Sequence, residues 1–210
     1  MANVAAPFGF SQRQGTGSSP TYEQTKVFIQ GNATAIYFGD PVTRLIDGSI
    51  GGNNTAQAPA NGTVIPGNAT LTGVFIGCEY VSVSQKRKVW GNYWPGSDVV
   101  SGGNLTGYVI NDPNAQFLVQ TGNSTTIGVA QGNVGQNCNF LYGNQTNASA
   151  NGISQAIVDV GVGFATTSTL PFRIVGLVTD PPGAPGTASG QYNYVVVAFN
   201  NVETKNTTGV

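Results

Sequence analysis

Residues 72–94 read TGVFIGCEYVSVSQKRKVWGNYW and give the clearest indication of the fold class. Two runs rich in β-branched and aromatic residues flank a short polar segment that contains Gln85, Lys86 and Arg87. Such runs favour β-strands, and a charged segment between two of them is typical of a solvent-exposed hairpin turn. The stretch therefore predicts an antiparallel β-hairpin.

The same pattern recurs on both sides of this hairpin. Short β-branched and aromatic runs predict further strands at residues 26–30, 34–39, 42–46, 106–112, 115–121, 138–143, 156–162, 173–180 and 192–202. Residues 48–62, 94–104 and 180–191 are rich in Gly, Pro and Asn and predict long loops, while residues 152–156 fit one short helical turn. We therefore expect an all-β fold, an antiparallel β-sandwich or β-barrel of roughly ten short strands.

The N-terminal residues differ from the rest of the chain. Residues 1–23 are rich in Gly, Ser, Gln and Pro and show no period that would bury an apolar face, so we expect an extended arm. They also lack the basic region and the apolar stretch of a secretory signal, which predicts synthesis in a cytoplasm. Residues 24–210 are expected to form a single all-β domain.

Charge is scarce in this sequence. Lys and Arg number 8 and Asp and Glu 9, a net charge of −1, and charged residues make up 8% of the chain where ~25% is usual. Nucleic-acid binding and electrostatic membrane attachment both need basic clusters, so we expect neither nucleic acid nor membrane as a partner. A surface of Asn, Thr, Ser and Gln with net charge near zero instead promotes association, which favours a protein packed in an assembly.

The sequence offers no catalytic or metal site. It contains no His, which excludes Ser-His-Asp and Cys-His nucleophiles. Cys78 and Cys138 are too few for a zinc site and predict two buried thiols. No spacing selects a catalytic pair of carboxylates, and several precede Pro or Gly, where Asp initiates turns, namely Asp40, Asp47, Asp112 and Asp180. We expect no enzyme, no cofactor and no metal.

Two groups of side chains are candidates for binding. Trp90, Tyr93 and Trp94 are typical of core or subunit-interface anchors, and they also resemble the stacking platform of a carbohydrate-binding module. The basic run that includes Lys86, Arg87 and Lys88 is either a solvated turn or a contact with an acidic patch on a partner.

Several longer segments together resemble a known family. They are MANVAAPFGF from residue 1, IYFGDPVTRLIDGSI from 36, GVFIGCEYV from 73, KVWGNYWPG from 88, GYVINDPNAQFLVQ from 107, LPFRIVGLV from 170 and YNYVVVAFNN from 192. This combination is similar to structural head proteins of tailed bacteriophages of aquatic bacteria, which are described as capsid decoration or cement proteins. The resemblance extends from residue 1 to about residue 201.

The resemblance implies a structural protein of the virion. Such a protein binds the outer surface of the phage head as a homo-oligomer, expected to be a homotrimer, contacts the major capsid protein and stabilises the shell. The arm, with Phe8, Phe10 and Arg13, is then expected to clamp neighbouring subunits. The aromatic and basic groups described above would contact the capsid or another subunit. The alternative is a phage fibre-type or lectin-like carbohydrate-binding β-module, and a glycoside hydrolase or lyase that uses Asp or Glu is a third reading.

Overall fold

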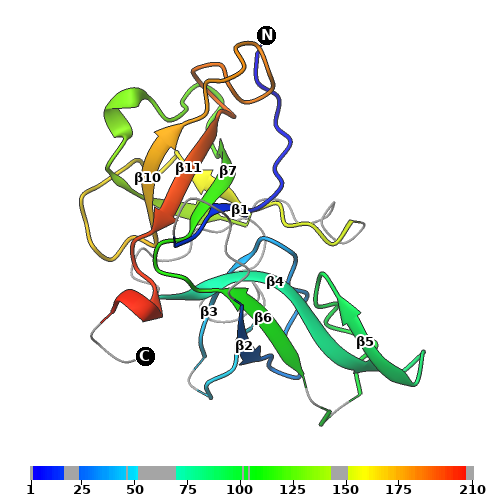
Figure 1. Ribbon diagram of the computed structural model, residues 1–210. Helices are drawn as coiled ribbons and strands as arrows, with labels where there is room; N and C mark the ends of the chain where they lie inside the picture. The colour runs from blue at the N-terminus through cyan, green and yellow to red at the C-terminus, as the bar shows by residue number, and fades with distance from the viewer. Residues whose placement is uncertain are drawn as a thin grey trace.

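The computed structural model describes residues 2–16, 24–45, 47–51, 70–100, 102–103, 105–142 and 151–206. The expected all-β fold is confirmed, with eleven strands in two sheets (Figure 1). Sheet A contains β1 (Ser11–Gln14), β7 (Gln116–Gly122), β8 (Asn137–Leu141), β9 (Ile157–Asp159), β10 (Phe172–Leu177) and β11 (Tyr194–Phe199). Sheet B contains β2 (Thr25–Phe28), β3 (Pro41–Thr43), β4 (Leu71–Ser82), β5 (Arg87–Gly91) and β6 (Thr106–Ile110). Two short 3-10 helices are η1 (Gln131–Asn133) and η2 (Glu203–Lys205).

Sheet A curls toward a barrel because the last strand in its order also pairs with the second strand. Antiparallel neighbours follow the order β1-β7-β11-β10-β8-β9, and β9 also pairs with β7. This last contact, through Thr121 with Val158 and Gly122 with Asp159, is the single parallel pair among the described strands. The curled sheet encloses an apolar core, here called core A, that contains five buried phenylalanines, namely Phe10, Phe117, Phe140, Phe172 and Phe199.

Sheet B is antiparallel throughout its described strands, in the order β2-β6-β4-β3. The strand β5 pairs with the C-terminal part of β4, from Cys78 to Ser82. One face of the sheet buries a second cluster, core B, around Phe75, Val109 and Trp94. A β-bulge between Phe75 and Gly77 interrupts the pairing of β4 with β6. On the opposite face the near ends of β4 and β6 place Val74 and Ile110 in core A. The long strand β4 therefore belongs to both cores.

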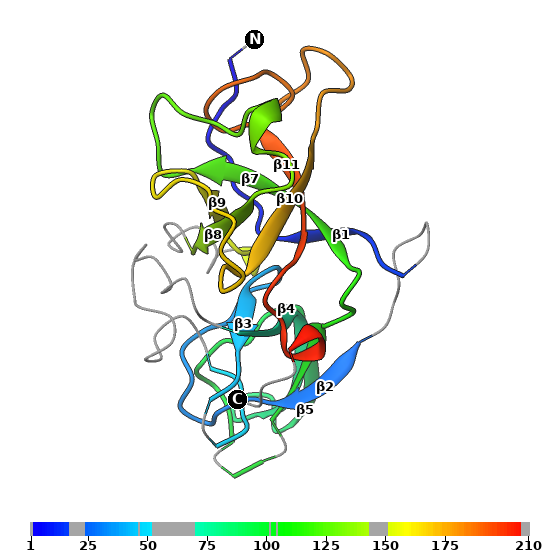
Figure 2. The same cartoon turned by 90° about the vertical axis from the view of Figure 1, so that its left-hand side faces the viewer.

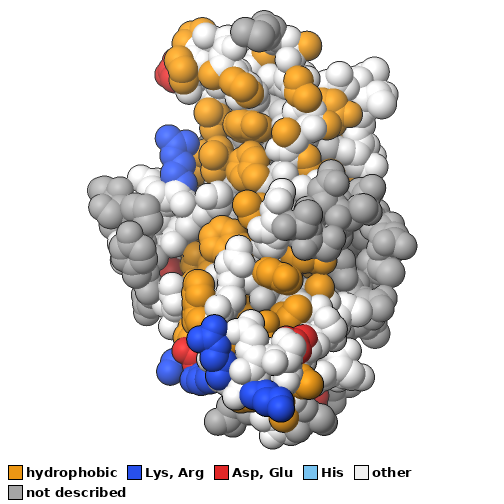
Figure 3. Space-filling model, turned by 90° about the vertical axis from the view of Figure 1, so that its right-hand side faces the viewer, with side chains coloured by type: hydrophobic (Ala, Val, Ile, Leu, Met, Phe, Trp, Pro, Cys, Tyr) orange, Lys and Arg blue, Asp and Glu red, His pale blue; other side chains and the backbone are white. Residues whose placement is uncertain are grey.

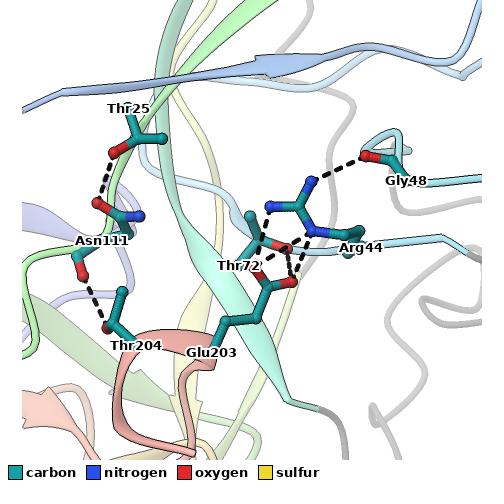
Figure 4. Close-up of polar contacts among 7 residues, drawn as sticks. All are labelled: Thr25, Arg44, Gly48, Thr72, Asn111, Glu203 and Thr204. Carbon is teal, nitrogen blue, oxygen red and sulfur yellow. Dashed lines mark hydrogen bonds and ion pairs between the residues drawn. The ribbon is translucent and has the colours of Figure 1, made fainter. Parts of the chain in front are cut away.

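The C-terminal segment fastens sheet A to sheet B, because η2 follows β11 and lies against sheet B (Figure 2). Arg44 donates to both oxygens of the Glu203 carboxylate, from Nε at 3.0 and 3.2 Å and from Nη2 at 2.9 Å. The Thr72 hydroxyl donates to the same carboxylate at 2.8 Å. The neighbouring Thr204 hydroxyl donates to the backbone oxygen of Asn111 at 3.0 Å (Figure 4).

The N-terminal arm lies on its own chain as far as residue 16. The backbone of β1 pairs with β7, and Phe10 inserts into core A with its ring 4.5 Å from that of Phe172. The Thr16 amide then donates to the Asp112 carboxylate at 2.6 Å. Arm residues 1 and 17–23 and loop residues 52–62 lie outside the described residues.

Most expected strands are confirmed, and two local expectations are wrong. Ten of the eleven expected strands coincide with observed ones, and the eleventh, residues 34–39, forms only isolated bridges from Ile36 to Trp94 and from Phe38 to Ile153. The helical turn fitted to residues 152–156 is not helical; Ile153 joins the bridge to Phe38 instead.

Both cysteines are confirmed as buried, free thiols. Cys78 lies in core B and Cys138 in core A, and neither forms a disulfide. Burial raises the pKa of the Cys78 thiol to about 12. Burial, aided by the nearby Asp159 carboxylate, also raises the pKa of the Cys138 thiol. Both thiols are therefore protonated and unreactive near neutral pH.

Candidate functional site

The β4–β5 hairpin places the basic run on the surface, as the turn interpretation expected. Ser82 pairs with Arg87, so residues 83–86 form the turn, and Lys86 adopts a left-handed φ of 51°. The Asp98 carboxylate holds this turn by accepting hydrogen bonds from the Ser82 hydroxyl at 2.6 Å and the Ser84 amide at 2.7 Å. These bonds lower the pKa of Asp98, because they favour the charged carboxylate.

The outer face of the hairpin carries charged and aromatic side chains. Side chains alternate between the two faces of a strand, and directly paired residues of neighbouring strands share a face. Trp90 pairs with Glu79, and Lys88 lies one position along the same face, where it forms an ion pair with Glu79. This ion pair lowers the pKa of Glu79 and raises the pKa of Lys88.

Trp90 is held against the backbone of β4. A Cβ atom placed on Gly77 would lie 3.0 Å from Cζ2 of the indole and 3.0 Å from the backbone oxygen of Gly91. A side chain at this position would be in tight contact with the ring and with the backbone of β5, and glycine avoids both contacts. Even so, 64% of Trp90 stays exposed, so the ring is supported from below and open to solvent above.

The same face continues across β6 and β2. Gly77 pairs with Tyr108 and Glu79 with Thr106 on β6. Tyr108 pairs in turn with Lys26, and Thr106 with Phe28, on β2. Phe28 is 67% exposed. We call this surface the aromatic face, defined by Phe28, Tyr108 and Trp90 with Lys26, Glu79 and Lys88.

Trp90, Tyr93 and Trp94 do not form one stacking platform, which corrects the carbohydrate-platform alternative, whereas the burial of Trp94 agrees with the core-anchor interpretation. Trp94 is fully buried in core B, where its indole N–H donates to the backbone oxygen of Ala33 at 3.1 Å. The half-buried Tyr93 stacks on Tyr37 at a centroid distance of 6.0 Å. Only Trp90 reaches the outer face, because the chain turns inward after β5.

The three arm residues that were expected to make contacts lie in three different environments. Phe10 is 1% exposed in core A, so it is not available to a partner, and its expected clamp role is withdrawn together with a direct contact role for Trp94. The half-buried Phe8 packs edge-on against Tyr194 with ring centroids 5.3 Å apart. Arg13 is exposed on β1.

A second apolar surface runs along the side of the molecule that carries the arm (Figure 3). Two contacts link its parts. The Gln155 side-chain amide donates to the backbone oxygen of Pro7, and Gly152 lies so close to Tyr93 that a Cβ atom placed on it would be 2.7 Å from the ring. On the two segments that these contacts join, Val4 is 70% and Ile153 42% exposed. We call it the apolar band, defined by Val4, Phe8, Tyr93 and Ile153.

One carboxyl group is buried between the two sheets. Asp40 is 1% exposed, and its carboxylate accepts hydrogen bonds from the Ser154 hydroxyl at 2.6 Å and the Tyr37 amide at 2.7 Å. Burial outweighs these two bonds and raises the pKa of Asp40 to about 7. The sequence predicts only that Asp40 initiates a turn, because an Asp followed by Pro does not indicate that the carboxyl group is buried.

No catalytic arrangement is evident in the part of the chain that the structure describes. Those residues contain no group of three or more His, Cys, Asp or Glu side chains that could hold a metal ion. They also contain no helix long and apolar enough to cross a membrane. No family model, no curated protein and no solved structure matches the chain. The candidate sites are therefore two surfaces, the apolar band and the aromatic face.

Proposed function

We propose that this protein is a structural capsid decoration protein, which coats the outer surface of a phage head as a homo-oligomer and stabilises the shell. The observation that carries the proposal is the apolar band, because monomeric soluble proteins seldom leave large contiguous apolar surface exposed. The scarcity of charge and the resemblance of seven sequence segments to phage head proteins support the same reading.

In this proposal the apolar band joins copies of the chain, expected to be three, and the assembled oligomer binds the major capsid protein. A ligand that binds only the assembled lattice stabilises that lattice by its free energy of binding, and no catalysis is required. The protein would then be made in the host cytoplasm and reside in the virion.

The test is the native mass of the purified chain by light scattering, followed by binding to heads from which the protein has been removed. A mass of about three chains and rebinding to the heads are expected. Ile153→Ser should weaken the oligomer, because it removes apolar area from the contact and places a hydroxyl group there. Val175→Ser is the matched control, since Val175 is 40% exposed on β10, on the opposite side of the molecule. A monomer that ignores the heads would contradict the proposal.

A further inference from the structure

The aromatic face is a second surface, separate from the apolar band. Near its junction with sheet A, the same side of sheet B is covered, since Val74 and Ile110 pack in core A. Farther along β4 and β6 nothing in the described chain covers it, and two large rings, Phe28 and Trp90, are more than 60% exposed. This end of sheet B therefore presents exposed aromatic rings that no described residue covers.

The rings are spaced by polar groups and do not form one continuous apolar patch. Phe28 and Trp90 lie on one row across the sheet with Thr106 and Glu79 between them. Three strand spacings separate them, roughly 14 Å. Protein-protein interfaces bury a contiguous apolar centre, whereas a pyranose ring presents an apolar C–H face to an aromatic ring and hydroxyl groups around its edge. Alternating rings and polar groups match the sugar better.

The support beneath Trp90 also suits a flat ligand. The indole rests on Gly77, so little conformational entropy remains to be lost when a ligand stacks on its open side. Beside it, the ion pair of Glu79 and Lys88 and the hydroxyl of Tyr108, which hydrogen bonds to Glu79, offer donors and acceptors in fixed positions.

The charge of the surface indicates an acidic ligand. Lys26 and Lys88 lie on the face together with one carboxylate, Glu79. Lys86 and Arg87 lie at the hairpin end, although Arg87 precedes Lys88 on β5 and therefore points to the opposite face. The Asp98 carboxylate also lies at this turn, so the four cations outnumber two carboxylates. Among the described residues, Lys88 alone of these four cations forms an ion pair. The chain as a whole has a net charge of −1, so this positive cluster is local and would attract anions to this end of the molecule.

We propose that the aromatic face binds an acidic polysaccharide, with sugar rings stacked on Trp90 and Phe28 and carboxylates paired with Lys26 and Lys88. This activity is independent of the proposed capsid role. A decoration protein with such a face would hold the particle on polysaccharide-coated surfaces.

The experiment measures binding of the full chain to polygalacturonate, with dextran as a neutral polysaccharide and poly-L-glutamate as an anion without sugar rings. We expect binding to polygalacturonate that exceeds binding to either control polymer. Trp90→Ala should weaken it by about tenfold, as loss of one stacking contact does elsewhere. The double variant Lys26→Gln with Lys88→Gln should weaken it and flatten its salt dependence. Val175→Ala and Arg173→Gln on β10 are the matched controls and should bind as the wild type does.

Three results would overturn this proposal. They are absence of binding to polygalacturonate, equal binding to poly-L-glutamate, and unchanged binding by Trp90→Ala. Light scattering of Trp90→Ala supplies a fourth: if that variant loses the oligomer of the wild type, the face is a contact between copies and not a polysaccharide site. Binding to phage heads is measured in a separate experiment. A failure of the capsid proposal therefore does not change the interpretation of the polysaccharide-binding results.

Discussion

Replacement of Asp40 by Asn should abolish a pH dependence of folding stability that the buried carboxyl creates. Asn has nearly the same shape, can accept the hydrogen bond from the Tyr37 amide and can donate one to the Ser154 hydroxyl. Tyr142 and Tyr37, the titratable neighbours that interact with Asp40, are neutral at the pH values concerned, because burial raises both of their pKa values. The titration of Asp40 itself is therefore isolated by the comparison.

The sign and size follow from linkage. The pKa of Asp40 is about 7 in the folded chain, whereas the ordinary pKa of an Asp side chain is 3.8. Between these values the folded state holds a proton that the unfolded state has released, so stability is highest at low pH and falls as the pH rises. At about 1.4 kcal/mol per unit over roughly three units, the loss amounts to about 4 kcal/mol.

The assay is urea unfolding of the wild type and of Asp40→Asn at intervals from about pH 4 to pH 8. The free energy of unfolding of the wild type minus that of the variant should fall across this range by about 4 kcal/mol. Asp47→Asn is the control, because hydrogen bonds from Ser49 lower the pKa of the exposed Asp47 below 3.8. Asp47 is therefore ionised in both the folded and the unfolded state over most of this range, and the difference for that pair should stay nearly flat. A difference for Asp40 that stays flat or rises would show that its two hydrogen bonds outweigh burial, and would refute the reasoning.

Three further predictions concern packing and the C-terminal contact. Phe10→Ala should lower the free energy of unfolding by about 3–5 kcal/mol because it leaves a cavity in core A. The surface variant Phe28→Ala should change the free energy of unfolding by less than about 0.5 kcal/mol. Equal effects of the two variants in urea unfolding would contradict the burial of Phe10. A double-mutant cycle on Arg44→Met and Glu203→Gln should give a coupling of about 1 kcal/mol that decreases in high salt, and additive effects would show that the pair contributes nothing. Gly77→Ala should destabilise the chain by about 1 kcal/mol and shift the fluorescence of the exposed tryptophan, since the new methyl group meets the indole; an unchanged emission spectrum would speak against that contact.

The strands could be predicted from local pattern, but their partners could not. β-branched and aromatic runs marked ten of the observed strands, because such residues fit a half-buried pleated surface. β1 escaped prediction because its sequence, SQRQ, is polar, and it is a strand through backbone pairing next to the buried Phe10. Residues 34–39 have the strand pattern, yet Gly39 turns the chain with a φ of 89° and only single bridges form.

The candidate surfaces depend on register, which a single sequence does not contain. Trp90 and Trp94 are four residues apart, but one is exposed and the other buried, because the chain leaves the plane of sheet B after β5. Phe28 and Tyr108 join Trp90 only through the pairing of β2, β6 and β4. A bulge in β4 shifts this pairing by one residue, which no local pattern would reveal.

The position of Phe10 also sets the order in which the chain can complete its fold. Its stacking partner Phe172 follows 162 residues later (172 − 10), and β1 pairs with a strand more than 100 residues away. Contacts of such long separation slow folding, because a large loop must close before they form. During synthesis β2 to β6 emerge together and can pair with one another, whereas core A waits for β10 and β11 near the end of the chain. Until β10 and β11 have been synthesised, Phe10 has no completed core to enter, and its side chain stays exposed on the nascent chain.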